Sequence, residues 1–235
     1  NINSKKLIVI GAAIECIHSY SLIHDDLPAM DNDNLRRGKL STHKKFNEFT
    51  AILAGNSLLT LAFEILSGND LKLPQTYKNE LIKTLSVCSG HSGLAGGQYF
   101  DLTFEKKKIS KNKIINMQKK KTGELFGFCC ESIAIINGEE LTVRRKFREI
   151  GINIGLLFQT IDDLIDFKGN SKIVGKPTGR DKKKGKATLV NLLGYDKTFK
   201  FAKKLKFKID KQIKKFGHKA EDLSETVELI FKRDF

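Results

Sequence analysis

The chain has 235 residues, of which 40% are hydrophobic, and carries a formal net charge of +15. No Pro/Gly/Ser-rich linker interrupts it, so we expect one domain over residues 1–235. No uninterrupted apolar run approaches the roughly 20 residues of a membrane span, and no signal peptide is visible. The four cysteines lie in apolar runs without a CxxC pair, which signals neither a zinc site nor a disulfide framework and fits a reduced, cytoplasmic setting.

The positive charge comes mostly from lysines that are spread over helix-like stretches. We interpret these lysines as a solvated surface, whose field would also attract anionic substrates. The sequence contains no motif for groove or single-strand recognition, so no nucleic-acid partner is expected.

Apolar residues recur at helical spacing along almost the whole chain, and no alternating strand pattern of any length is present. The first stretch, residues 5–24, already has the character of a fold interior, so we expect further helices ahead of it. The pattern predicts an all-α bundle of long antiparallel helices, with the active site in a central cavity between facing helices. The predicted helices cover residues 5–24, 47–67, 76–93, 111–136, 140–168, 187–194, 196–216 and 219–233.

A first acidic cluster ends the helix predicted for residues 5–24. Asp25 and Asp26 close this helix, and Asp31 follows after Pro28. On an ideal helix Asp25 and Asp31 would point about 240° apart. Because proline removes a helical hydrogen bond, Pro28 is placed to interrupt the helix and bring both carboxylates toward one metal ion.

A second acidic cluster ends the helix predicted for residues 140–168. Asp162 and Asp166 are four residues apart, so they share one helix face and repel each other, and Asp163 lies about 100° round. Either cluster alone could be a solvated helix end. Two clusters without histidine or cysteine suit a hard cation such as Mg²⁺, which keeps waters and is completed by substrate phosphates.

With these motifs the chain resembles the trans-isoprenyl diphosphate synthases, most closely the bacterial farnesyl diphosphate synthases. The resemblance runs essentially from end to end, and the ordered combination of its motifs is far more specific than any one of them. It is carried by residues 15–31, 35–38, 96–101, 121–123, 158–166 and 175–188.

The resemblance implies a head-to-tail prenyltransferase that uses Mg²⁺, with three ions expected between the two clusters. Dimethylallyl diphosphate, and then geranyl diphosphate, would ionise to an allylic cation, which isopentenyl diphosphate attacks before a proton is lost. The product would be farnesyl diphosphate. A geranyl or geranylgeranyl product and a non-catalytic partner subunit remain alternatives. A basic helical protein that binds nucleic acid or acidic membranes would leave the paired carboxylates unexplained.

The resemblance also assigns roles to residues. Arg36, Arg37, Lys121 and Lys176 would bind the diphosphates, Thr122 and Gln159 would place dipoles near the cation, and Lys186 would come from a loop over the site. Asp25, Asp31, Asp162, Lys121, Thr122, Gln159 and Lys176 would be catalytic, with Lys121, Gln159, Lys176 and Lys186 also contacting substrate. The metal ligands would be Asp25, Asp26, Asp31, Asp162, Asp163 and Asp166.

Two further implications concern assembly and product length. The apolar stretch at residues 53–66 is where the family forms its homodimer, and a Gly-Lys-x-x-Arg-Pro segment is expected ahead of residue 5. Ser21 is small and lies one turn before Asp25, which leaves room for a growing chain. Tyr20 is bulky and is expected to help form the floor of the pocket.

Overall fold

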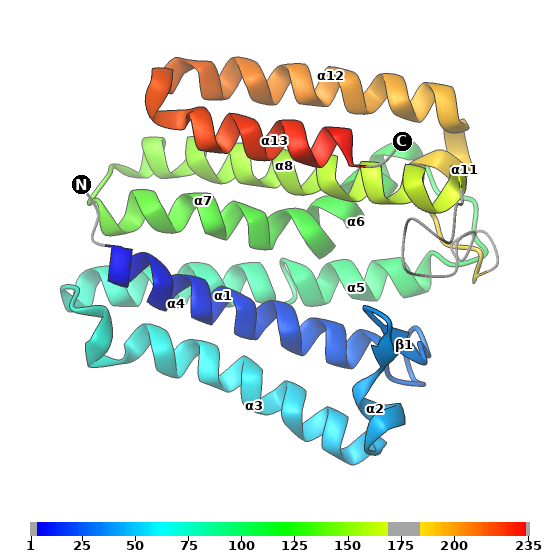
Figure 1. The fold of residues 1–235 in the computed structure, drawn as a ribbon, viewed down its shortest axis with the longest axis horizontal. Helices are drawn as coiled ribbons and strands as arrows, with labels where there is room; N and C mark the ends of the chain where they lie inside the picture. Colours follow the sequence, from blue (N-terminus) through cyan, green and yellow to red (C-terminus); the bar gives the residue numbers. More distant parts are fainter. Residues whose placement is uncertain (1–3, 169–183, 234–235) are drawn as a thin grey trace. The chain divides into compact units, whose positions relative to one another are not determined.

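The computed structural model describes residues 4–168 and 184–233, and it confirms the all-α fold (Figure 1). The chain divides into two compact units. Unit 1 comprises residues 1–86 and 132–139, and unit 2 comprises residues 87–131 and 140–235. The interpretation of these residues as one functional domain stays a prediction.

Unit 1 is organised around two long helices that lie side by side, α1 and α3 (Figure 1). They approach closely because Gly55 of α3 has no side chain: a Cβ there would lie 2.1 Å from His24 Nε2. His24 Nε2 lies 3.1 Å from the carbonyl oxygen of Ile52. This contact fixes the end of α1, where the first acidic cluster begins. The elements of unit 1 are α1 (Ser4–Asp25), β1 (Leu35–Arg36), β2 (Lys39–Leu40), α2 (Thr42–Lys45), α3 (Glu48–Ser67), η1 (Asn69–Leu71) and most of α4 (Gln75–Ser89).

By length and composition alone, α1 and α3 are long and apolar enough to cross a membrane. Neither helix is an uninterrupted apolar run, since α1 contains Glu15 and α3 contains Asn56 and Glu64. The finding is weak support for a span, because the core helices of soluble proteins pass the same test.

A short antiparallel hairpin of β1 and β2 was not expected from the sequence. Its turn residues, Arg37 and Gly38, have φ values of 52° and 75°. Two successive left-handed residues are the hallmark of a type I′ turn, whose twist matches that of the flanking strands. Strands of two residues are too short to produce an alternating pattern. The hairpin places Arg36 on a strand and Arg37 at the tip.

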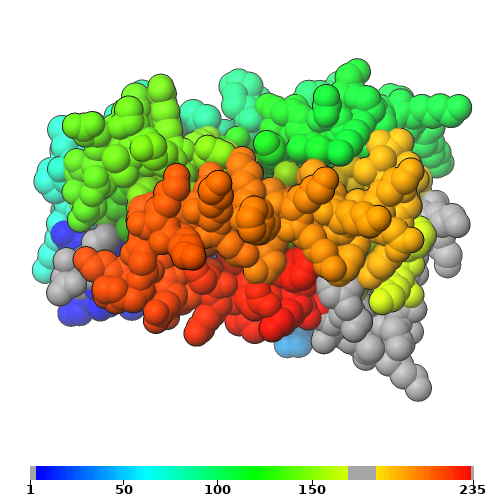
Figure 2. All heavy atoms as spheres, turned by 90° about the horizontal axis from the view of Figure 1, so that it is seen from above, coloured from blue at the N-terminus to red at the C-terminus, as the bar shows by residue number. Residues whose placement is uncertain are grey.

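Unit 2 is built around α8 (Leu141–Lys168), with α12 and α13 packed against it (Figures 1 and 2). Its core is a continuous cluster of buried aliphatic side chains, including Leu157, Ile161 and Leu164 of α8 and Ala202 and Ile209 of α12. The other elements are α5 (Leu94–Thr103), α6 (Lys111–Gln118), η2 (Lys119–Gly123), α7 (Glu124–Ile136, which ends in unit 1), α11 (Leu189–Leu193), α12 (Tyr195–Ile213), η3 (Lys214–Ala220) and α13 (Glu221–Lys232).

The single helix predicted for residues 111–136 is interrupted by a π-helical turn, η2. Glycines from two neighbouring helices meet this turn. A Cβ on Gly97 of α5 would lie 2.1 Å from the backbone nitrogen of Lys121, and one on Gly155 of α8 would lie 2.7 Å from the Cα of Gly123. Because π turns inside α-helices are frequent at functional sites, the presence of η2 favours a functional role for Lys121 and Thr122.

Candidate active site

The first acidic cluster lies in a compact turn at the end of α1. The helix ends at Asp25, before Pro28, and the backbone N–H of Asp31 donates to the carbonyl oxygen of Asp25 at 2.9 Å. Asn32 then takes a left-handed conformation with φ 50°. The structure thus confirms the predicted interruption. It brings the backbones of Asp25 and Asp31 together, and both side chains are half-buried.

Asp26 differs from its two neighbours in the motif because it is buried and binds Arg36. Arg36 Nε donates to Asp26 Oδ2 at 3.2 Å, Arg36 Nη2 donates to Oδ1 at 2.5 Å, and Asp33 lies 3.9 Å from Nη2. Burial would lower the pKa of Arg36, but the hydrogen bond and charge of Asp26 outweigh it and raise the pKa. Arg36 is therefore a fixed cation, whereas Arg37 is exposed.

The two residues expected to set product length lie on α1. Ser21 is buried, and its Oγ donates to the carbonyl oxygen of His18 at 2.8 Å. Tyr20 is half-buried and meets the ring of His24 edge-on, with 5.4 Å between the ring centroids. Burial, and then the charge of Asp25, raise the pKa of Tyr20, so its phenol keeps its proton at neutral pH.

In unit 2 a chain of hydrogen bonds links η2 to the second acidic cluster. Thr122 Oγ1 donates to Gln159 Oε1 at 3.0 Å, and Gln159 Nε2 donates to Asp163 Oδ1 at 2.8 Å. The other oxygen of Asp163 accepts a bond from Gln118 Nε2 at 2.6 Å. Asp163 is buried, so its carboxylate fixes the orientation of the Gln159 amide. The family resemblance had assigned roles to Thr122, Gln159 and Asp163, and the structure brings these three residues together.

The two remaining acids of this cluster are more accessible. Asp162 and Asp166 are half-buried at the C-terminal end of α8, one helical turn apart. Arg233 Nη2 lies 3.8 Å from Asp162 Oδ1, and its guanidinium lies 4.8 Å from the centre of the Phe158 ring. A guanidinium at this separation from Asp162 offsets part of its negative charge.

Asp101 of α5 joins two lysines that the resemblance had assigned to substrate binding. Its Oδ2 accepts bonds from Lys121 Nζ at 2.7 Å and from Lys186 Nζ at 2.8 Å. Lys186 is buried and also lies 2.9 Å from Glu105 Oε1. Burial would raise the pKa of Asp101, but the two ammonium groups outweigh it and lower the pKa. Lys176 lies outside the described residues.

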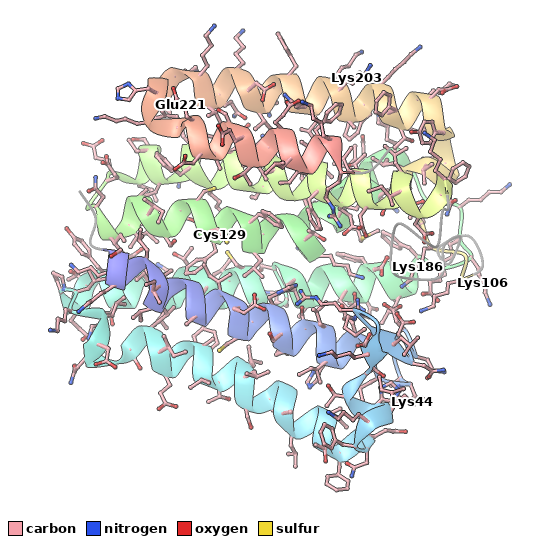
Figure 3. The ribbon with its side chains drawn as sticks, in the orientation of Figure 1. Lys44, Lys106, Cys129, Lys186, Lys203 and Glu221 are labelled. Atoms are coloured by element: carbon pink, nitrogen blue, oxygen red, sulfur yellow. The ribbon has the colours of Figure 1, made fainter. Side chains whose placement is uncertain are left out.

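The backbone ties the segment that carries Lys186 to the end of α5. The N–H of Lys106 donates to the carbonyl oxygen of Gly185 at 2.8 Å, and Gly185 has a left-handed φ of 72°. Figure 3 shows Lys106 and Lys186 at the same end of the unit. Lys186 is thus anchored against α5 in this structure, whereas the resemblance expects it to contact substrate.

No role had been predicted from the sequence for Gln98, Asp101, Glu105 or Gln118. Gln98 is buried, and neither atom of its amide has a hydrogen-bond partner in the structure. Buried polar groups are normally hydrogen-bonded, so an ordered water or a ligand is expected to bind this amide. Gln98 and Asp101 are three residues apart on α5 and therefore on one face. Their helical spacing within the motif at residues 96–101 was the signal available beforehand.

The donor chemistry of the acidic motifs fits Mg²⁺. Among residues 4–168 and 184–233, no three His, Cys, Asp or Glu side chains form a ready metal-binding group. Mg²⁺ uses one or two carboxylates and completes its shell with waters and substrate phosphates. Half-buried carboxylates such as Asp25, Asp31, Asp162 and Asp166 match that requirement, since they keep access to solvent.

Comparison with known proteins places these motifs in a family. The model of the polyprenyl synthetase family matches residues 1–230. The farnesyl diphosphate synthase of Micrococcus luteus is 43% identical over 194 residues, which make up 83% of this chain and 66% of that protein. That of Escherichia coli is 39% identical over 228 residues, which make up 95% of this chain and 75% of the relative. The chain thus spans slightly under two thirds of the first relative's length.

Solved structures of related enzymes are similar to this chain in fold as well as in sequence. An FPP/GFPP synthase from Zymomonas mobilis superposes with a TM-score of 0.87 at 39% identity, covering 98% of this chain and 78% of that one. A geranyltransferase from Helicobacter pylori, complexed with magnesium and isoprenyl diphosphate, gives a TM-score of 0.84 at 32% identity. That match covers 95% of this chain and 73% of the other.

Proposed function

The chain belongs to the polyprenyl synthetase family, and we propose that it is a head-to-tail prenyltransferase that makes farnesyl diphosphate. Its substrates are dimethylallyl diphosphate and then geranyl diphosphate, each condensed with isopentenyl diphosphate. The observation that carries the proposal is the hydrogen-bonded chain from Thr122 through Gln159 to Asp163. It joins three positions to which the family resemblance had assigned roles. The relatives' names as farnesyl diphosphate synthases and the magnesium complex of a relative support it.

Carboxylates of both acidic motifs hold Mg²⁺ in this proposal, and we propose three ions. Asp25, Asp31, Asp162 and Asp166 are the accessible ligands, and Asp26 and Asp163 mainly orient their neighbours. When bound, Mg²⁺ neutralises the charge that develops on the departing diphosphate.

The cationic side chains bind the diphosphates. Arg36 uses its Nε and one Nη2 hydrogen on Asp26, and a guanidinium has five N–H donors, so donors remain for a phosphate. Arg37 is exposed and takes the second diphosphate through its planar fork. Lys121, held by Asp101, adds a positioned ammonium group, and Lys176 is proposed to join it.

Gln159 and Thr122 face the allylic cation. The amide of Gln159 donates to Asp163 and accepts from Thr122, so its dipole is fixed before substrate arrives. A preorganised dipole stabilises developing charge without the cost of reorienting during the reaction. Proton loss to the departing diphosphate completes each round.

Two broader proposals accompany the activity. We propose a homodimer that uses α3, whose exposed side chains include Phe49 and Leu53. We also propose a cytoplasmic location, in keeping with four cysteines that are all free thiols.

The test is a product assay on the complete protein. It is incubated with Mg²⁺, dimethylallyl diphosphate and labelled isopentenyl diphosphate, and the products are separated by chain length after phosphatase treatment. A fifteen-carbon alcohol that disappears with EDTA and returns with Mg²⁺ is expected. A ten- or twenty-carbon alcohol would keep the prenyltransferase and overturn the farnesyl assignment. No product from folded protein would favour a non-catalytic partner subunit.

A further inference from the structure

The outer face of α12 gathers lysines around one exposed aromatic ring. The inner face is buried against the core of unit 2 through Thr198, Ala202, Leu205, Ile209 and Ile213. At 100° per residue, Phe207 lies nearly opposite these residues, and four exposed lysines lie within about 60° of it. Phe207 is 72% exposed. We call this set the Phe207 face; its members are Lys200, Lys203, Lys204, Phe207 and Lys211.

The Phe207 face is strongly positive. Between Lys200 and Lys211 the one acid on α12 is Asp210, which is half-buried and held by Lys206 at 2.7 Å. Of the exposed acids of unit 2, Asp196 lies in the first turn of α12, ahead of Lys200, Glu149 binds Lys208 at 2.8 Å, and Glu221 and Asp222 lie in the first turn of α13. Figure 3 shows Lys203 on α12, where its Nζ lies 4.7 Å from the centre of the Phe199 ring, and α12 lies at the surface of the unit (Figure 2). The result is a convex line of ammonium groups that runs about 17 Å from Lys200 to Lys211 at 1.5 Å per residue.

We propose that the Phe207 face docks on the surface of an anionic phospholipid membrane. A straight helix ridge can contact a flat surface along its whole length. Lysine stems can lie on apolar surface while their ammonium groups meet lipid phosphates, and an aromatic ring enters the headgroup region between them. This lysine-and-aromatic pattern is the one that interfacial helices use, and each lysine adds attraction to an anionic leaflet.

A nucleic-acid strand is the less favoured partner for this face. Surfaces for single strands stack successive bases on several aromatic rings along a groove. The Phe207 face has one fully outward ring and is a ridge. The proposal is independent of the prenyltransferase activity, because docking is measured without substrate.

The first test compares two triple variants of the complete protein with the same change in net charge. K200E/K204E/K211E alters the Phe207 face, and K83E/K107E/K146E alters exposed lysines elsewhere. Binding is measured by sedimentation with phosphatidylcholine vesicles that contain one third phosphatidylglycerol. The first variant is expected to lose about 100-fold or more in partition coefficient, at about fivefold for each lysine lost and more for each reversal. The second is expected to stay within a few-fold of wild type.

The second test isolates the ring. F207S is compared with L229S, which changes a side chain of similar exposure, 69%, on α13. F207S is expected to weaken vesicle binding about fivefold while leaving its dependence on salt unchanged, because no charge is altered. L229S is expected to bind as wild type. Thermal melting checks that all four variants fold.

Three results would overturn the proposal. The first is that wild-type protein does not bind the phosphatidylglycerol vesicles. The second is an equal loss in both triple variants, which would show a response to net charge alone. The third is that a single-stranded oligonucleotide binds more tightly than the vesicles and depends on the same three lysines, which would identify a nucleic-acid surface.

Discussion

At the scale of single residues, Asp101 is the clearest structural addition to the expected site. One oxygen of this buried carboxylate holds both Lys121 and Lys186. We expect D101N to destabilise the protein by about 2 kcal/mol, less than the loss of a fully buried ion pair because Lys121 is partly exposed. Urea unfolding at neutral pH measures this difference, and D196N, at an exposed position of α12, should stay within about 0.5 kcal/mol of wild type.

The comparison of wild type with D101N also predicts how stability depends on pH. The folded-state pKa of Asp101 is lowered from its ordinary value of 3.8, so its stabilisation is fully present above that value. The stabilisation is lost as the pH falls through the folded-state pKa. The difference in unfolding free energy between wild type and D101N should therefore be constant from neutral pH to about pH 5 and shrink below about pH 4. A difference that grows on acidification would contradict the ion-pair account.

We expect product length to depend on single residues as well. Replacing Tyr20 with alanine should lengthen the product, since it removes a half-buried ring one residue from Ser21. S21F should shorten the product to ten carbons, because Ser21 is buried and a ring there would fill the space one turn before Asp25. S21A is the matched control and should leave the product unchanged. Chromatography of the dephosphorylated alcohols measures product length for all three variants. An unchanged product distribution in Y20A would eliminate the hypothesis that Tyr20 forms the floor of the pocket.

The sequence predicted the positions of these residues better than their contacts. Pro28 was enough to predict that the helix breaks between Asp25 and Asp31, because the effect of proline is local. It could not show that Asp26 binds Arg36, or that Asp163 binds Gln118 from 45 positions away. Those pairings depend on how the hairpin and the helices pack.

At the scale of elements, the glycines around η2 decide how closely the helices approach. A Cβ on Gly97 would lie 2.1 Å from the Lys121 backbone nitrogen, so α5 and η2 would have to separate. We expect G97A to destabilise unit 2 by about 3 kcal/mol, at the upper end of overpacking effects, since the obstacle is backbone. Activity should fall with it, because Lys121 and Thr122 both lie on η2.

G11A is the control for this change. Gly11 lies within α1, and a Cβ there would meet nothing within 4 Å. Alanine should stabilise the helix by about 0.5–1 kcal/mol through its higher propensity. The urea unfolding midpoints of both variants measure these changes in stability. A G97A variant as stable as wild type would show that η2 is not held by close packing.

Helix periodicity predicted most helices to within a few residues, including α3, α8 and α12. It did not predict η2, because the π turn lies inside an otherwise continuous helical pattern. The glycines that pack against this turn, Gly97 and Gly155, belong to helices that are far from it in the sequence. The β1–β2 hairpin was missed because Arg37 takes a left-handed conformation that its residue type does not suggest.

At the scale of the whole molecule, α3 is the surface that we propose for self-association. Its exposed residues include Phe49 and Leu53, which are 67% and 60% exposed and four apart, so they share one face. Replacing Leu53 with glutamate should convert the proposed dimer to monomer in analytical ultracentrifugation, because an unpaired charge would be buried at the interface. L229E, on α13, should leave the dimer intact. A dimer that survives L53E would place the interface elsewhere.

In the proposed mechanism, both acidic motifs act on the same diphosphate. A double-mutant cycle tests it most directly, using D25E, D162E and the double variant of the complete protein in the steady-state condensation assay with Mg²⁺. Glutamate is chosen so that residual activity stays measurable, and circular dichroism checks that each variant folds. Residues that act as one unit have non-additive effects on rate. Each single change is expected to lower activity, and the double variant is expected to be only slightly less active than the less active single variant. Losses that multiply, or full activity in either single variant, would contradict this mechanism.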